Sequence, residues 1–202
     1  MIEKVAITAA HNYVEKGMIK KDEEEVCVYG LQLLISSMIS IGAVLVISIV
    51  NGSLIQGMVY LTAYCILRSY SGGYHADTHI ACISTFIGSF IVISNFVKYV
   101  DFKWGSYIYM LLLFCNAIIF IFAPNEAINN PISQRSKEKM KRKAHGCIII
   151  FSVAVLFFWH IGLWSIAEFM VMGMFLCTVL VLVGGLKNIR WRKRNENIQE
   201  IS

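Results

Sequence analysis

Long apolar stretches separated by short polar segments run through most of the chain. Several of them approach the roughly 20 residues that a helix needs to cross the hydrocarbon of a bilayer. A helix is favoured there because it satisfies its own backbone hydrogen bonds where no water can. The pattern predicts six spans with approximate bounds 26–50, 54–67, 80–97, 104–123, 147–163 and 169–186. The second is short, so we expect it to be tilted or to continue into the polar residues after it.

The first 15 residues show a different pattern, because their apolar side chains recur at helical spacing along one face. The residues on that face are Ile2, Val5, Ala6, Ala9 and Tyr13. Such a helix can lie in the plane of the membrane interface or dock onto the rest of the protein, and the pattern favours neither. No cleavage site follows a suitable apolar region, so we expect no removable signal peptide.

Composition changes the picture from a helical protein to a membrane protein. Hydrophobic residues make up 57% of the 202 residues, the mean hydropathy is +0.63, and only 15% of residues are charged. Soluble domains carry about a quarter of charged residues. We therefore expect an all-α, polytopic membrane protein with a single domain over 1–202. Its expected parts are an amphipathic interfacial segment at 1–25, a transmembrane bundle at 26–186 and a basic cytoplasmic tail at 187–202.

The placement of basic residues predicts the orientation of the spans, because Lys and Arg are enriched in cytoplasmic loops. If the N-terminus is cytoplasmic, all of the 18 Lys and Arg residues except Lys98 and Lys103 fall in cytoplasmic segments. This asymmetry favours an even number of spans with both termini in the cytoplasm. It also places the polar segment at 68–82 on the cytoplasmic face.

The polar segment from 124 to 146 is expected to be a basic loop. Its charge is explained by orientation alone, or by docking of an acidic partner such as a lipid headgroup or a peptide. Lys141, Arg142 and Lys143 are the candidate contacts. Nucleic acid is not an expected partner, because the net charge is only +5 and the basic clusters flank apolar spans without interleaved aromatic residues.

The six cysteines include no CxxC pair, so a disulfide framework is not expected. Five of them lie in apolar runs, where a free cysteine behaves as a small hydrophobic residue. Cys82 differs, because it ends the polar segment RSYSGGYHADTHIAC at 68–82.

Polar and ionisable groups at a membrane boundary are costly, so this segment indicates a functional site. Cys82 is the candidate nucleophile, since a neighbouring histidine and a helix N-terminus both favour the reactive thiolate. His75 is the candidate base. In one continuous helix the pair would be about 10 Å apart along the axis, so we expect the helix that carries Cys82 to begin after His75. Gly72 and Gly73 permit a tight turn.

Other residues of the segment have less specific interpretations. Arg68 is expected to anchor at the headgroups or to bind a carboxylate. Ser71 and Asp77 are candidates to orient His75, although a solvated position is expected for both. His75, His79 and Cys82 have a spacing compatible with a zinc site, but neither a fourth ligand nor an HExxH motif accompanies them. Glu168 is expected in a short outer turn, without a role.

Two groups of residues resemble the hallmarks of a known family, accessory gene regulator B (AgrB), whose members are quorum-sensing membrane endopeptidases. The first group is Arg68, Gly72, Gly73, His75, Ala76 and Cys82. The second group is Ala123-Pro124 and Asn130-Pro131-Ile132, followed by a Lys/Arg-rich stretch. With the predicted spans included, the resemblance covers the whole chain.

The resemblance implies a multi-pass cysteine endopeptidase of the bacterial cell membrane with Cys82 and His75 as its catalytic residues. Its substrate would be a small amphipathic, AgrD-like precursor peptide, cleaved in its C-terminal part through an S-acyl enzyme and cyclised to a thiolactone or lactone. Gly72, Gly73 and Arg68 would support the oxyanion or the substrate. No cofactor and no role for His79 are implied, and a homodimer stays open. The alternatives are a small transporter, a non-catalytic scaffold or a zinc protease.

Overall fold

The computed structural model describes the backbone of residues 2–72, 79–99, 106–125 and 134–201. Side chains are described over the same ranges except at 79–82, 98–99, 106, 188 and 191–201.

The described residues form seven α-helices and one short 3-10 turn, so the expected all-α class is confirmed. The helices are α1 (Ile2–Glu15), α2 (Glu24–Val50), α3 (Leu54–Ser71), α4 (His79–Tyr99), α5 (Ser106–Phe122), α6 (Gln134–His160) and α7 (Trp164–Ile201). The 3-10 turn, Lys21–Glu23, leads directly into α2. Within the described residues, each of the six predicted apolar stretches lies mainly in a helix.

Three of these helical segments are long and apolar enough to cross a membrane, which indicates a membrane protein. They are Lys21–Val50, Gln134–His160 and Trp164–Lys187. Shorter apolar helical segments occupy Ile83–Val97 and Tyr107–Phe122. The count of six spans stays a prediction.

Several boundaries differ from those that the sequence predicts, in part because polar residues can also be good helix formers. The segment 124–146 is not a loop throughout, since α6 begins at Gln134 and carries the basic residues 135–143 on its first turns. Lys, Arg, Glu and Met all favour helix, and Ala144 and Ile148 bury one face of this helix. Helix α7 begins at Trp164 and not near 169, and it continues to Ile201, beyond the predicted end at 186 and through the segment expected to be a tail.

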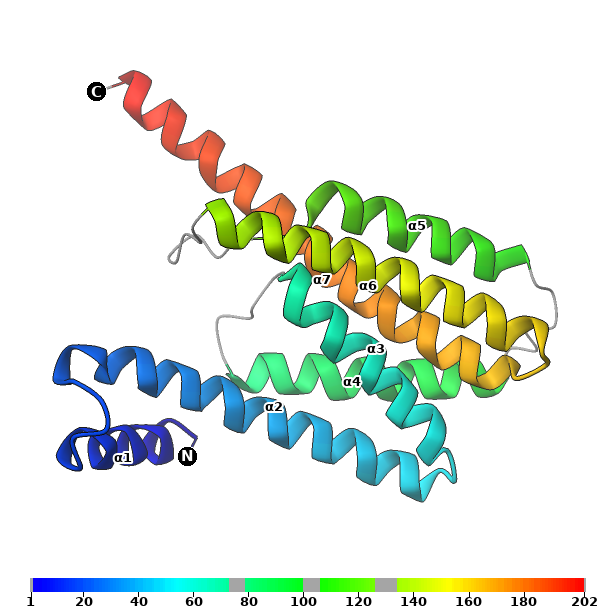
Figure 1. Ribbon diagram of the computed structural model, residues 1–202, viewed down its shortest axis with the longest axis horizontal. Helices are drawn as coiled ribbons and strands as arrows, with labels where there is room; N and C mark the ends of the chain where they lie inside the picture. The colour runs from blue at the N-terminus through cyan, green and yellow to red at the C-terminus, as the bar shows by residue number, and fades with distance from the viewer. Residues whose placement is uncertain (1, 73–78, 100–105, 126–133, 202) are drawn as a thin grey trace.

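The apolar helices alternate in direction, as Figure 1 shows. The N-terminal ends of α2, α4 and α6 and the C-terminal ends of α3, α5 and α7 lie on one side, at the left in this view, together with both chain ends. We call this side the basic end, because it holds Arg68, the basic first turns of α6, Lys187 and Arg190. The arrangement agrees with an even number of crossings. The assignment of the basic end to the cytoplasm stays a prediction.

Helix α7 lies at the centre of the bundle, where it packs against α3, α4, α5 and α6. It approaches α3 closely at Gly173, where an added Cβ would lie 2.6 Å from the carbonyl oxygen of Tyr60. Small residues allow helix backbones to approach in membrane proteins. Val171, Met174 and Val181 are fully buried along the same helix.

Helix α1 docks onto α2, which confirms one of its two interpretations. Ala6 and Ala10 are fully buried, and His11 Nδ1 lies 3.5 Å from Glu24 Oε1. Val5 and Ile7 stay exposed. Contact of the helix with the membrane interface stays a prediction.

Candidate functional site

The two motif segments, about 50 residues apart in sequence, meet at the end of α3. The backbone N–H of Asn125 donates a hydrogen bond to the carbonyl oxygen of Ser71 at 2.9 Å, and Gly72 pairs with Asn125 in a parallel bridge. Arg68 Nη1 donates to the carbonyl oxygen of Gly72 at 2.6 Å. We call these four residues, Arg68, Ser71, Gly72 and Asn125, the junction.

Gly72 ends α3 in a conformation that requires glycine. Its φ of 66° and ψ of −145° lie in a region essentially restricted to this residue. A Cβ at this position would also clash with the carbonyl oxygen of Asn125. The expected glycine turn is therefore confirmed at Gly72, whereas Gly73 lies outside the described residues.

Helix α7 contacts the junction through two of its residues. The side-chain Nδ2 of Asn125 donates to the carbonyl oxygen of Val181 at 3.1 Å. Ser71 Oγ lies 3.3 Å from Cys177 Sγ, and both residues are fully buried. The solvated role expected for Ser71 is therefore wrong, because the helix turns its hydroxyl toward α7.

Lys143, on the basic first turns of α6, contacts the end of α3 beside the junction. Its Nζ lies 5.2 Å from the centre of the Tyr70 ring, within the range of a cation–π contact. Lys141 and Arg142 are exposed on the same turns of α6. Three of the expected supporting residues, Arg68, Gly72 and Lys143, thus lie at the end of α3. Lys141 and Arg142 directly precede Lys143 in sequence.

Cys82 lies in the first turn of α4, which is described from His79 onward. The sequence predicts this place near a helix N-terminus. His75 lies outside the described residues, and so do the side chains of His79 and Cys82. The contact between base and nucleophile, and the zinc alternative, therefore stay predictions.

Asn125 is the functional candidate that sequence reasoning missed. It directly follows Ala123-Pro124, and this position after a helix end was its only signal. Its partners in α3 and α7 are distant in sequence, so spacing could not reveal them.

Comparison with known proteins shows the family of the chain. The family model of accessory gene regulator B matches residues 6–182. The chain belongs to the accessory gene regulator B family.

Relatives with AgrB-like names extend over most of the chain. AgrB-like protein 2 of Clostridium perfringens strain 13 is 28% identical over 180 residues, covering 83% of each chain. The AgrB-like protein of strain SM101 is 26% identical over 92% of this chain and 94% of its own. A third, from Listeria innocua, is 29% identical over 71% of this chain and 72% of its own. No solved structure matches the chain.

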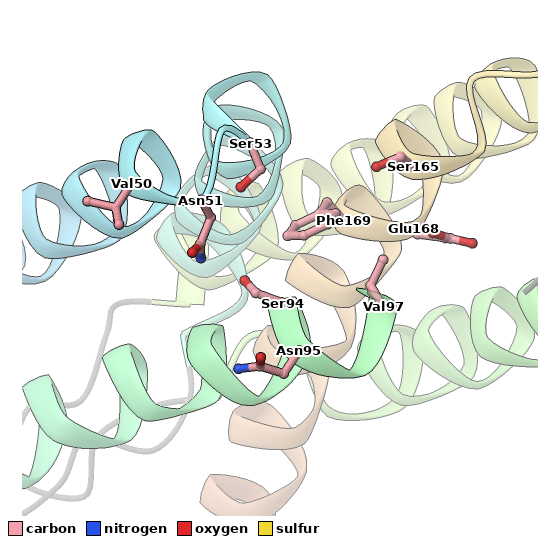
Figure 2. A pocket seen from close by; sticks show the side chains of 9 residues that line it. All are labelled: Val50, Asn51, Ser53, Ser94, Asn95, Val97, Ser165, Glu168 and Phe169. Atoms are coloured by element: carbon pink, nitrogen blue, oxygen red, sulfur yellow. The ribbon is translucent and has the colours of Figure 1, made fainter. Parts of the chain in front are cut away.

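A polar cavity lies at the other end of this AgrB-family chain, away from the junction (Figure 2). It is bounded by the α2–α3 turn, the C-terminal part of α4 and the first turns of α7. Glu168, one of its lining residues, is only 8% exposed and lies within α7. The expectation that Glu168 occupies an outer turn is therefore wrong, because α7 begins earlier than predicted.

Proposed function

We propose that this AgrB-family protein is a membrane cysteine endopeptidase that cleaves and cyclises a small peptide at its basic end. The observation that carries the proposal is the junction. It joins both motif segments of the family to each other and to α7, at the end of the bundle where α4 presents Cys82 in its first turn.

The proposed reaction begins with proton transfer from the Cys82 thiol to His75. The thiolate attacks a peptide carbonyl carbon in the C-terminal part of the precursor and forms a tetrahedral oxyanion. Collapse of this intermediate breaks the peptide bond, His75 returns the proton to the leaving amine, and the N-terminal part remains as a thioester on Cys82. A thiol or hydroxyl of the bound peptide then attacks the thioester, which releases Cys82 and closes a thiolactone or lactone.

The junction supplies the rigidity that this chemistry needs. The distance between a base and a nucleophile must be held near 3 Å. The segment that contains His75 follows Gly72, and Gly72 is held in place by its contacts with Arg68 and Asn125. Arg68 holds the carbonyl of Gly72, and Asn125 ties the same residue to α7. Backbone N–H groups at Gly73 or the start of α4 are the proposed donors to the oxyanion, because the N–H of Gly72 already donates to the carbonyl oxygen of Arg68 at 3.2 Å.

The basic turns of α6 are the proposed docking surface for an acidic segment of the precursor. Lys143 lies against Tyr70 beside the junction, and Lys141 and Arg142 extend the positive charge away from it into solvent. Opposite charge accelerates encounter and fixes the register of the partner. The same basic residues favour a cytoplasmic location for this end, where an amphipathic precursor concentrated on the membrane surface would reach it.

Co-expression with a candidate precursor tests the function. Mass spectrometry would follow the cleaved fragment, the cyclic product and the acyl adduct on the protein. Cys82→Ser and His75→Ala are expected to abolish all three, whereas Cys27→Ser and His79→Ala serve as matched controls. Normal cleavage by Cys82→Ser would exclude the thiol mechanism. Loss of cleavage on addition of a chelator, together with loss in His79→Ala, would favour the zinc protease.

A further inference from the structure

The hydroxyl of Ser71 contacts a neighbouring helix, although its own helix offers a partner. Serine inside a helix commonly donates to the carbonyl oxygen four residues earlier, and Ser48, Ser69 and Ser152 do so at 2.7, 2.8 and 2.8 Å. Ser71, the last residue of α3, instead places its Oγ 3.3 Å from Cys177 Sγ on α7. The side chain therefore forms a contact between helices in place of a local one.

Cys177 and Val181 lie one turn apart on the same face of α7 and contact the two motif segments separately. Cys177 meets Ser71 at the end of α3, whereas the carbonyl oxygen of Val181 accepts from Asn125 Nδ2 at 3.1 Å. The backbone N–H of Asn125 donates to the carbonyl oxygen of Ser71 at 2.9 Å. These three contacts and one turn of α7 form a closed ring, in which each contact limits the movement that the other two allow.

The ring lies immediately before the segment that contains the proposed base. Ser71 is followed by Gly72, where α3 ends, and His75 comes three residues after Gly72 in sequence. Ser71 and Cys177 are both fully buried, so their contact is shielded from water. A thiol is only a weak hydrogen-bonding group. We therefore expect this contact to affect the position of Ser71 more than the stability of the protein.

We propose that Cys177 is a positioning residue of the peptidase. Through Ser71 it holds the end of α3, so that the segment that follows brings His75 to Cys82. The inference rests on the proposed function, because it assigns Cys177 a role in that reaction. The thiol of Cys177 is fully buried, so the residue acts through Ser71 and does not touch the peptide.

Cleavage kinetics of the full-length protein in nanodiscs test the proposal, with a synthetic AgrD-like precursor that the wild type cleaves. In Cys177→Ala the hydroxyl of Ser71 can turn back to the carbonyl of Leu67, and kcat is expected to fall about 5- to 20-fold through misplacement of His75, with KM unchanged. Cys177→Ser restores a hydrogen-bonding group and should recover kcat to within about twofold of the wild type. Cys115→Ala removes a fully buried thiol of α5 from the same apolar core, so it controls for lost volume and should leave kcat unchanged.

Ser71→Ala provides a second measurement if Cys177→Ala fails to fold, because it removes the same contact from the α3 side. The double variant should be no slower than either single variant, since two residues that act as a pair are not additive. Additive losses of kcat would show that Cys177 does not act through Ser71. A kcat in Cys177→Ser as low as in Cys177→Ala would show that the hydrogen bond is irrelevant, and either result would overturn the proposal.

Hydrogen exchange needs no substrate, so it separates a failure of this inference from a failure of the proposed function. In Cys177→Ala the backbone N–H of Asn125, which donates to Ser71, is expected to exchange about fivefold faster than in the wild type and in Cys115→Ala, because local opening becomes easier. Unchanged exchange, or a kcat equal to that of Cys115→Ala, would overturn the proposal. If the wild type cleaves no precursor, the proposed function fails, and the exchange rate alone decides whether Cys177 holds the junction.

Discussion

Asn125 donates its backbone N–H to the carbonyl oxygen of Ser71 and its side-chain amide to the carbonyl oxygen of Val181. Asn125, in the segment that follows α5, therefore connects the end of α3 with the middle of α7. The segment that contains His75 leaves α3 directly after this contact. The junction therefore fixes the residue from which the chain continues toward the proposed base, His75.

We expect Asn125→Ala to reduce peptide cleavage about 10- to 100-fold, the order of loss that a small misplacement of catalytic groups causes. Asn125→Asp keeps the size but cannot donate to Val181, so it should lose activity to a similar extent. Asn116→Ala is the matched control, because Asn116 Nδ2 donates to Ser152 Oγ at 2.8 Å between α5 and α6. Both alanine variants should lose about 1 kcal/mol of stability, measured by thermal unfolding in detergent. Equal activity of the two would contradict a positioning role for Asn125.

Gly72→Ala should abolish cleavage and destabilise the protein by about 1–3 kcal/mol, because its backbone conformation is strained for any other residue and its Cβ would meet Asn125. Gly17→Ala is the comparison. Gly17 has the same φ of 66°, but nothing lies within 4 Å of an added Cβ. It should cost about 1–2 kcal/mol of left-handed strain and leave cleavage intact. An active Gly72→Ala variant would show that the close approach to Asn125 is dispensable.

Gly173→Val should destabilise the bundle by about 1–3 kcal/mol through overpacking between α3 and α7. Gly146→Ala should instead be stabilising by roughly 0.5–1 kcal/mol, since this helical glycine has open space around it and alanine favours helix. Chemical denaturation in one detergent would compare the two. The packing of α7 against Tyr60 would be refuted by a Gly173→Val variant as stable as the wild type.

Lys143→Gln should raise the KM for an acidic precursor about two- to fivefold and leave kcat unchanged, as expected for an exposed charge contact. The difference from wild type should shrink at high salt, because screening weakens such contacts. Lys16→Gln removes a positive charge from the turn that follows α1 and should leave KM unchanged. Equal effects of both substitutions would indicate a general dependence on charge and no local docking on α6.

The sequence predicted the helices well and their ends less well. Apolar runs such as 26–50 reveal a membrane helix by composition alone, and α2 extends over that range. The start of α6 was missed because its first turns are polar, and hydropathy does not separate a polar helix from a polar loop. Glu168 was misplaced for a related reason, since the short turn at 161–163 brings α7 forward.

The site was predicted only in part, for a different physical reason. Gly72 and Arg68 could be singled out because residue type and neighbourhood determine their behaviour. Asn125 could not, because its role depends on α3 and α7 meeting in space. Hydrogen bonds between distant segments leave no periodic pattern in a single chain.

Helix α7 runs without a break from Ser165 at the polar cavity to Val181, which contacts the junction. The length of helix between these two residues is about 24 Å at 1.5 Å per residue. A rod of fixed length that spans the bilayer must tilt when the hydrocarbon becomes thinner. Tilting would move Val181, and with it Asn125, relative to α4. We therefore expect the proposed cleavage, measured in nanodiscs, to vary with lipid acyl length, so that under the proposed function membrane thickness would regulate how much cyclic peptide a cell makes.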